Sequence, residues 1–425
     1  MLSERIKRIG EAFKNLGGWF IFLFIVYLIF LIKIATIDNY QNNLFFQAYS
    51  MIVTGFILSR FLFAYFHRPV AMDENYQPSV TFVVPAKNEQ DNIAETIMRF
   101  NRVDYPKTNI EVIAINDGST DNTLWEMLRA KRQIGGEIRI DIIDWKKNRG
   151  KREGMAEGIK RASHDIIIFV DSDSFVDKDC VKNLVKYFSD PKVGAVSGHT
   201  DVYNKDTNLL TKMQALRYYV AFKIYKSAES LFGAVTCCPG CCSAYRKEYL
   251  MEFLEPWLKQ KFLGVQCTYG DDRSLTNKII KKYKAVYSDE AKAWTVVPDT
   301  LRKYIRQQQR WKKSWVRETL IASNFMWKKN PLAALSFYSY IFIAFTSPLV
   351  FFRAVAWYPA ATGNWPIVYL AGLFLMLLLH GIFYSIEGGK SWLSSVVAFW
   401  VVSLMLIWQL PWALLTIRDP KWGTR

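Results

Sequence analysis

The sequence predicts an α/β domain with a parallel, Rossmann-like sheet, inserted between transmembrane α-helices. Two observations support this fold class. Apolar residues, which make up 51% of the 425-residue chain, are concentrated towards its two ends, and strand and helix patterns alternate between those ends. The run 166–169 is a continuous series of β-branched and aromatic residues, which is typical of a central strand covered on both faces.

Two apolar stretches near the start, 18–32 and 48–66, each approach the roughly 20 residues that span a bilayer core. Basic residues precede the first stretch and no small-residue cleavage pattern follows it, so we expect an uncleaved span rather than a signal peptide. The positive-inside rule then places the amino terminus in the cytoplasm. Residues 1–69 are predicted to form two transmembrane helices, and residues 70–300 a cytoplasmic catalytic domain.

Apolar character resumes after residue 330. The segment before it is rich in cations and is predicted to be a helix that lies on the cytoplasmic leaflet. Three apolar stretches follow, and Pro348 and Arg353 interrupt the first of them. The stretches are 333–356, 366–386 and 392–417, and the predicted divisions are an interfacial helix at 301–330, transmembrane or interfacial helices at 331–418 and a terminal segment at 419–425.

The net charge of +17 is spread over membrane-flanking segments and candidate phosphate sites, without a basic-aromatic module for nucleic acid. Anionic lipid and an anionic sugar nucleotide explain this charge more simply. All six cysteines fall in the predicted cytoplasmic part, where thiols stay reduced. The cluster at 237–242 lacks a second cysteine or histidine pair, so we expect small side chains that line a pocket rather than a zinc site.

Polar loops follow the predicted strands at 80–85, 110–116 and 138–143, where an open α/β sheet binds ligands. Lys87 and Lys151 each follow a strand at this edge, and both are predicted to lie near a nucleotide. Solvated surface charges are the alternative interpretation of the two lysines.

Asp171 and Asp173 come directly after the strand at 166–169. At positions i and i+2 they point the same way from an extended backbone and can share one divalent cation with a diphosphate. We expect Mg²⁺ or Mn²⁺, because both ions prefer oxygen ligands and accept phosphate in their shell. The alternative is an Asp-x-Asp loop that occurs by chance.

Four motifs occur in the order and spacing of a processive, membrane-embedded family 2 glycosyltransferase: Asp117, Asp171-Ser172-Asp173, Gly270-Asp271-Asp272 and Gln307-x-x-Arg310-Trp311. The segment 269–277 and the terminal Trp422-Gly423-Thr424-Arg425 resemble hyaluronan synthases, and this resemblance covers nearly the whole chain. It implies a GT-A (Rossmann-like) cytoplasmic domain. One region, 232–246, departs from that pattern and, together with 295–301, is closer to the chitin-oligosaccharide synthases of rhizobia.

The resemblance implies a role for each motif. Asp173 and Asp171 would hold the metal, Asp171 and Asp117 the uridine side, and Asp272 would be the general base. Arg310 would contact the diphosphate and Trp311 would stack on the acceptor sugar. The remaining predicted substrate-binding residues are Gly240 and Cys241 in the acceptor loop, Asp271 and Arg273 beside the base, Gln307, and the gating residues Trp422, Thr424 and Arg425.

The reaction itself calls for such groups. A departing diphosphate needs a cation, and an acceptor hydroxyl needs a carboxylate to take its proton. A base opposite the leaving group gives direct displacement with inversion, so an α-linked UDP-sugar yields a β-linkage. The alternatives are that Gly270-Asp271-Asp272-Arg273 is only a helix cap with a salt bridge, and that Trp311 is only an interfacial anchor.

A gating segment at the end of the chain demands a cytoplasmic carboxyl terminus. Three full crossings after residue 330 would place it outside, so one stretch is predicted not to cross, and the stretch that holds Pro348 and Arg353 is the candidate. The expected protein is a multi-pass plasma-membrane enzyme with four spans. Its expected partners are UDP-sugars, the growing polysaccharide and membrane lipids, without nucleic acid or an obligate protein partner.

Two products stay open at this point. A hyaluronan synthase would use UDP-GlcNAc and UDP-GlcA, whereas a chitin-oligosaccharide synthase would use UDP-GlcNAc alone. A transferase that adds one sugar to a polyprenyl phosphate shares the fold but needs no Gln-x-x-Arg-Trp helix. An inactive transporter or scaffold would not need the four aspartates 117, 171, 173 and 272 together.

Overall fold

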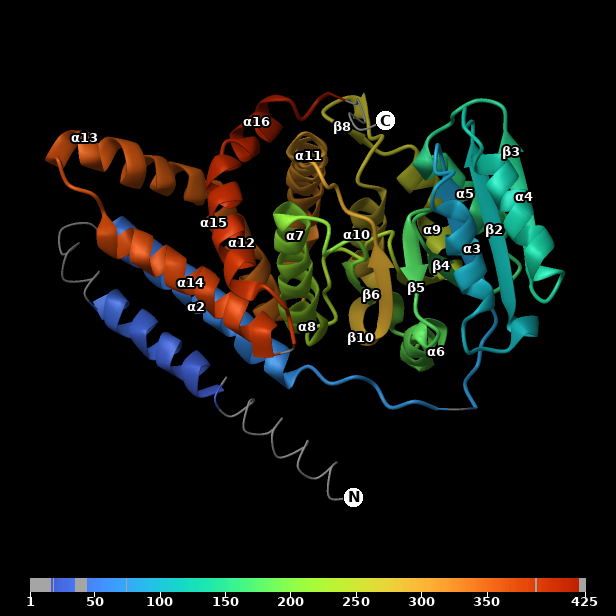
Figure 1. The fold of residues 1–425 in the computed structure, drawn as a ribbon, viewed down its shortest axis with the longest axis horizontal. Coiled ribbons are helices and arrows are strands. Elements are labelled where there is room, and N and C mark those ends of the chain that lie inside the picture. Colours follow the sequence, from blue (N-terminus) through green and yellow to red (C-terminus); the bar gives the residue numbers. More distant parts are fainter. Residues whose placement is uncertain (1–16, 18, 35–43, 74, 387, 420–425) are drawn as a thin grey trace, which may run out of the picture.

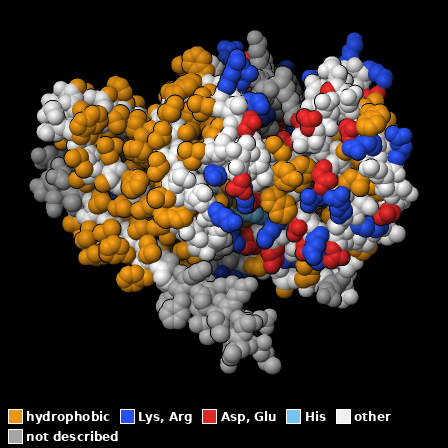
Figure 2. Space-filling model, viewed as in Figure 1, with side chains coloured by type: hydrophobic (Ala, Val, Ile, Leu, Met, Phe, Trp, Pro, Cys, Tyr) orange, Lys and Arg blue, Asp and Glu red, His pale blue; other side chains and the backbone are white. Residues whose placement is uncertain are grey.

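The computed structural model describes residues 17, 19–34, 44–73, 75–386 and 388–419. Apolar helices gather at one end of the molecule and an α/β domain forms the other, so the two parts lie side by side (Figure 1). The side chains divide in the same way, with hydrophobic residues dense over the helices and charged residues mixed over the domain (Figure 2). The predicted placement of an α/β domain between apolar helices is confirmed for the described residues.

The domain is built on one eight-stranded sheet in the order β3-β2-β1-β4-β7-β6-β10-β5. Strands β3, β2, β1 and β4 are mutually parallel, as predicted. Beyond β4 the sheet is mixed, because β7 runs antiparallel to both β4 and β6, and β5 antiparallel to β10. The strands are β1 (Val80–Ala86), β2 (Ile110–Asp117), β3 (Arg139–Trp145), β4 (Ile166–Phe169), β5 (Ser174–Val176), β6 (Val193–Val202), β7 (Ser243–Arg246) and β10 (Lys284–Thr295), and β8 (Lys261–Phe262) pairs with β9 (Val265–Gln266) in a separate ribbon.

The prediction of a parallel sheet is confirmed for the four strands that support it, and the mixed part beyond them contains two strands that the sequence does not reveal. β7 has four residues and directly follows the cysteine loop, so its pattern is too short to recognise. β10 carries charged residues along its length and shifts register between Tyr287 and Lys292, which hides its alternation. Both strands are held by neighbours distant in the sequence.

Helices cover both faces of the sheet. One apolar cluster unites residues of α3 (Ile93–Asn101), α4 (Thr123–Ile134) and α6 (Cys180–Val185) with one face, and a second unites α5 (Lys151–Arg161), α9 (Lys247–Leu258) and α10 (Asp271–Lys282) with the other. The second cluster continues into α11 (Leu301–Met326) and the start of α12 (Pro331–Phe352). The domain and the apolar helices thus share a core.

In the part of the chain that the structure describes, four helices are long and apolar enough to cross a membrane: α2 (Leu44–Phe66), the continuous helix Pro331–Thr362, α14 (Ile367–Ile386) and Trp392–Leu415. A shorter apolar helix, Trp19–Ile34, precedes them. A third apolar cluster joins that short helix, α2, α14 and α15 (Trp392–Met405) to α7 (Leu209–Tyr219), which continues through the π-helical segment Val220–Lys226 into α8 (Ser227–Ser230). The domain therefore meets the apolar helices through α7 and through α11.

The break in the carboxyl-terminal helices lies elsewhere than predicted. Pro348 sits inside α12, and the helix continues through a π-helical turn at Arg353 into α13 (Tyr358–Thr362). The interruption is instead at 406–408, between α15 and α16 (Gln409–Leu415). The turn is held because Gln409 Nε2 donates to the Ile305 carbonyl on α11, at 3.3 Å. The first stretch is continuous, and the last one bends back towards the domain.

The close packing of α5 on β1 gives a test of the fold. A methyl group on Gly158 would lie 2.2 Å from Val83 Cγ1, so Gly158→Ala should cost about 1 to 3 kcal/mol and lower the melting temperature of the purified protein by several degrees. Gly55→Ala is the matched control, because nothing lies within 4 Å of the added methyl there. Equal melting temperatures for the two variants would contradict this packing.

Candidate active site

The loops that follow β1 and β2 are joined at the carboxyl edge of the sheet. Asn88 has a left-handed backbone, with a φ of 55°. Its side-chain oxygen accepts a hydrogen bond from the Thr120 backbone amide at 2.9 Å, and its backbone amide donates to Ser119 Oγ at 3.0 Å. Lys87 precedes this turn and is half-buried. The two loops therefore form one surface rather than two independent ones.

Asp117 ends β2 and organises the neighbouring basic loop. Its carboxylate accepts hydrogen bonds from the backbone amides of Arg149 at 2.6 Å and Gly150 at 3.0 Å. A side chain at Gly118 would strike the backbone of Asn148 at 2.5 Å, so the two loops touch without space between them. Asp117 is buried and holds the loop that leads into α5 and Lys151.

Lys151 and Asp171 form an ion pair across this edge. Burial by itself would lower the pKa of Lys151, but the ion pair and hydrogen bond with Asp171, together with the charges of Asp272 and Asp271, raise it above its ordinary value. Lys151 is therefore a permanent cation among three carboxylates. Two of the predicted site residues are thus in direct contact.

The cysteine loop closes against the same carboxylate. A methyl group on Gly240 would lie 2.7 Å from Asp171 Oδ1, and Cys241 Sγ lies 3.7 Å from Asp171 Oδ2. Burial, and then the charges of Asp171 and Asp173, raise the pKa of the Cys241 thiol well above its ordinary value, so the thiol is neutral. Only glycine fits at position 240 while Asp171 keeps its place.

Asp173 has hydroxyl neighbours and a partly open carboxylate. Thr295 Oγ1 at the end of β10 lies 3.5 Å from Asp173 Oδ1, and Ser174 Oγ lies 3.4 Å from the same atom. No group of three or more His, Cys, Asp or Glu side chains suited to a metal ion occurs among the described residues. Two carboxylates without further protein ligands fit a cation such as Mg²⁺, which is usually bound through one or two carboxylates together with substrate phosphates.

Asp272 lies in the first turn of α10, after Gly270, whose φ of 76° is left-handed. Its Oδ1 accepts a hydrogen bond from the Arg273 amide at 2.9 Å, and Cys237 Sγ lies 3.9 Å from Oδ2. Burial, reinforced by the charge of Asp272, raises the pKa of Cys237 to about 11, so this thiol is also neutral. The predicted base therefore faces the cysteine loop.

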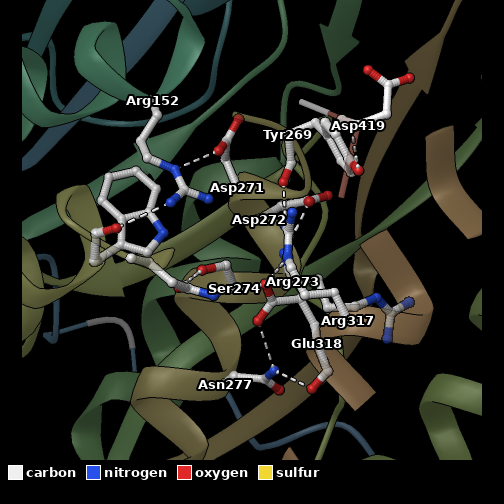
Figure 3. A network of polar contacts seen from close by, with 12 residues as sticks. Arg152, Tyr269, Asp271, Asp272, Arg273, Ser274, Asn277, Arg317, Glu318 and Asp419 are labelled. Carbon is white, nitrogen blue, oxygen red and sulfur yellow. Dashed lines mark hydrogen bonds and ion pairs between the residues drawn. The ribbon is translucent and has the colours of Figure 1, made fainter. Parts of the chain in front are cut away.

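Asp271 differs from its neighbour in partner and in burial. Its Oδ1 accepts a hydrogen bond from Arg152 Nε at 2.7 Å, and the side chains of this pair are only 3% and 7% exposed (Figure 3). Arg152 also donates to the Trp257 carbonyl at 3.0 Å and stacks over the Trp257 ring. Asp271 is thus locked to α5 and α9.

A second buried pair, on α11, lies under the Asp271–Asp272 turn. Arg317 Nε and Glu318 Oε1 are 2.8 Å apart at 3% and 1% exposure, and Arg317 also donates to the Tyr269 carbonyl (Figure 3). Glu318 accepts hydrogen bonds from Gln260 at 2.9 Å and Asn277 at 3.2 Å. A side chain at Gly270 would overlap Ser314 Oγ at 1.9 Å, so α11 is pressed directly against the turn.

The predicted Gln307, Arg310 and Trp311 lie on α11, six to ten residues before Arg317. Trp311 is 37% exposed, and the Arg217 guanidinium of α7 lies 5.9 Å from its ring centroid. Arg217 also donates to Gln308 and, at 2.7 Å, to the Tyr304 hydroxyl. An aromatic surface is therefore held beside cations at the junction of α7 and α11.

The predicted gating residues Trp422, Thr424 and Arg425 lie outside the described residues. The chain just before them reaches the site, because the Tyr269 hydroxyl donates to the Asp419 carbonyl at 3.2 Å and Lys313 pairs with the Asp419 carboxylate at 3.0 Å. Residue 419 therefore lies beside the turn that carries Asp271 and Asp272.

Several residues of this arrangement could not be found from the sequence. Arg152, Arg217, Arg317 and Glu318 each lie on a helix whose pattern is typical of an ordinary charged surface, and the partners in these four bonds are 48 to 119 residues away. Thr295 lies in the segment 295–301, where the sequence indicates only a resemblance to chitin-oligosaccharide synthases. The one available signal was the dense cation content of 301–314, which indicated a membrane surface instead.

Three comparisons place the chain among known proteins. The model of "Glycosyl transferase family 2" matches residues 81–254. A hyaluronan synthase of Streptococcus pyogenes is 29% identical over 418 residues, which cover 95% of this chain and 97% of that protein. An N-acetylglucosaminyltransferase of Azorhizobium caulinodans is 30% identical over 352 residues, which cover 82% of this chain and 87% of the relative.

The fold has a solved counterpart as well. A mannosyltransferase of Pyrobaculum calidifontis, solved with GDP-Man and Mn²⁺, aligns over 83% of this chain and 97% of its own at a TM-score of 0.61 and 22% identity. The predicted GT-A fold is confirmed.

The buried pair on α11 gives a test of the site. Glu318→Gln keeps the shape but leaves Arg317 as a buried cation without its counter-charge, which should cost about 3 to 5 kcal/mol. The melting temperature and the transferase rate should both fall, because the turn that carries Asp272 loses its support. Glu157→Gln, in an exposed pair with Arg161, is the control and should change neither quantity measurably. Equal behaviour of the two variants would refute this role.

Proposed function

The chain belongs to glycosyl transferase family 2, and from that premise we propose that it is a processive, inverting β-glycosyltransferase that polymerises UDP-sugars and moves the polysaccharide across the membrane. The first choice of product is hyaluronan, made from UDP-GlcNAc and UDP-GlcA. The observation that carries this proposal is a line of polar and charged groups from the candidate base into the apolar helices.

That line begins at Arg273, next to Asp272. Burial would lower the pKa of Arg273, but Cys237, Asp272, Tyr340 and Glu229 raise it, so the guanidinium keeps its charge. Tyr340 belongs to α12, so the active site borders an apolar helix at this point. A growing chain that leaves Asp272 would meet these groups first.

The line continues at Arg60 in the carboxyl-terminal third of α2. Arg60 is buried, donates to Ser336 Oγ of α12 at 2.6 Å and interacts electrostatically with Glu229. A charge inside a membrane helix is costly and usually marks a pathway for a polar substrate. Arg60, on the apolar helix α2, and Arg273, on α10 of the domain, thus both interact electrostatically with Glu229.

In the transfer step, Lys87, Asp117 and Lys151 would surround the nucleotide, with Lys151 compensating the charge of Asp171. Asp173 and Asp171 would hold Mg²⁺ or Mn²⁺, which supplies positive charge to the departing diphosphate. Asp272 would take the proton of the acceptor hydroxyl, and Trp311 would stack on the acceptor sugar beside Arg310 and Gln307. We assign Asp271 a positioning role, because its carboxylate is occupied by Arg152.

The sign of the charge in the apolar helices favours an acidic polymer. In the described apolar helices 19–34, 44–66, 331–362, 367–386 and 392–415, every charged side chain is a cation, namely Lys33, Arg60 and Arg353. Cations in these helices suit a chain that carries carboxylates, such as hyaluronan, better than a neutral one.

Chitin oligosaccharide made from UDP-GlcNAc alone is the second candidate. Gly240 and Cys241 belong to a loop whose neutral thiols reach both Asp171 and Asp272, and the chain is 30% identical to an N-acetylglucosaminyltransferase over 352 residues. The choice of acceptor would be made at this loop.

We further propose that the catalytic domain faces the cytoplasm and that the helices Trp19–Ile34, α2, α12–α13 and α14 cross the membrane. The stretch α15–α16 starts beside the domain at Lys390 and ends beside it at Asp419, so it would run along the membrane surface. This arrangement keeps four crossings and returns residue 419 to the cytoplasmic side.

The product is tested with the purified full-length protein and radiolabelled UDP-sugars, singly and in pairs. We expect polymer only when UDP-GlcNAc and UDP-GlcA are both present, and we expect hyaluronidase, but not chitinase, to degrade it. Polymer from UDP-GlcNAc alone that chitinase degrades would overturn the first choice in favour of the second.

The base is tested with Asp272→Asn. We expect the rate of transfer to fall by about 10² to 10⁴ while UDP affinity stays within about twofold, because general base catalysis contributes that range. UDP binding is measured by calorimetry and serves as the control for folding. A variant that makes polymer at the wild-type rate would exclude Asp272 as the base.

A further inference from the structure

A cavity of about 400 Å³ lies where the domain meets the end of α14, apart from the site described above. Its walls come from α7, from β6 and β10, from Tyr384 near the end of α14, and from Gly388, Gly389 and Lys390. In Figure 2, lysine, aspartate and histidine side chains gather over α7, β6 and β10, where the apolar half of the molecule meets the polar half. The cavity is therefore polar and lies at the boundary of the apolar helices.

The cavity has an excess of positive charge. Five lysines line it, of which Lys223 pairs with Asp289 at 2.7 Å and Lys205 lies 3.9 Å from Asp201. Lys212, Lys292 and Lys390 have no ion pair among the described residues, and Asp206 is the only other carboxylate of the described lining. His199, also in the lining, is neutral near pH 7, because burial lowers its pKa to about 4. Three lysines from three separate segments thus line the cavity together with one further carboxylate, that of Asp206.

Apolar and aromatic residues also line the cavity. Trp294, Tyr219 and Tyr384 line it, and Tyr384 is two residues from the end of α14. The turn at Gly388 and Gly389 packs so closely on the Tyr384 ring that a methyl group on Gly389 would lie 2.5 Å from it. Aromatic residues beside lysines at the end of an apolar helix are typical of the headgroup level of a bilayer.

We propose that this cavity binds the phosphate headgroup of an anionic phospholipid from the leaflet that faces the catalytic domain, with Lys212, Lys292 and Lys390 as its cationic ligands. Basic pockets at the ends of membrane helices suit lipid phosphates, whereas the acyl chains would lie along α14 and α15. A soluble phosphate compound shares the phosphate chemistry but leaves the aromatic side unused.

Occupancy of this cavity would act on the active site through two shared elements. On β10, Trp294 lines the cavity and the next residue, Thr295, contacts Asp173 on the opposite face of the strand. On α7, Lys212 and Tyr219 line the cavity, whereas Arg217 lies beside Trp311. A bound headgroup would brace both elements, so transfer should be faster when the lipid is present. This inference needs the membrane location but not the identity of the polymer.

The test compares the full-length protein with the variant K212Q/K292Q/K390Q in detergent micelles. Wild type should gain thermal stability on addition of phosphatidylglycerol but not of phosphatidylcholine with the same acyl chains. The variant should bind phosphatidylglycerol roughly 100-fold more weakly, since three lysines at an anionic surface each contribute severalfold to affinity. K131Q/K160Q/K281Q, which neutralises three exposed lysines elsewhere, should behave as wild type.

Further measurements distinguish loss of the site from misfolding, and a lipid ligand from a soluble phosphate compound. The charge-preserving K212R/K292R/K390R should keep phosphatidylglycerol binding, and UDP affinity should be unchanged in all variants. Equal phosphatidylglycerol affinity of wild type and K212Q/K292Q/K390Q would overturn the site. An equal gain from phosphatidylcholine, or a gain from inorganic phosphate or UDP that depends on the three lysines, would overturn the lipid assignment. None of these outcomes depends on which sugars are polymerised.

Discussion

The contact between α11 and the turn at 269–272 is the constraint on which the rest of the site depends. Arg317 holds the Tyr269 carbonyl, Glu318 holds α10 through Asn277, and Ser314 fills the space that a side chain at Gly270 would need. One helix thus carries Trp311 and, one to two turns further along, supports the turn of Asp272. Because both side chains of the pair are buried, the turn cannot move away from α11 without leaving a buried polar group short of a hydrogen bond.

The carboxylates of the site divide into those that are occupied and those that remain available. Asp117 is held by two backbone amides, Asp171 by Lys151 and Asp271 by Arg152. Asp272 has no ion pair among the described residues, although it adjoins Asp271 in the sequence. Two adjacent aspartates therefore have different environments, and this difference makes one a structural residue and the other the candidate base.

The fold was predictable where its signals are local. The parallel strands β1 to β4, the helices between them and the order of the four motifs all follow from runs of a few residues, and each lies close to where the pattern placed it. The antiparallel β7, the irregular β10 and the bend at 406–408 were missed, because they are stabilised by segments far away in the sequence. A strand of four residues has no period of its own to detect.

The sequence by itself determined the fold class, the apolar helices and the identity of the chemical groups, because hydropathy, periodicity and motif spacing are local properties of the chain. Only the tertiary structure decided which carboxylates are neutralised, which apolar stretch returns to the domain and which cations support the base. Arg152 meets Asp271 across 119 positions of the chain, and Arg217 meets Gln308 across 91. Pairings over such separations depend on how helices pack on the sheet, and no local pattern encodes them.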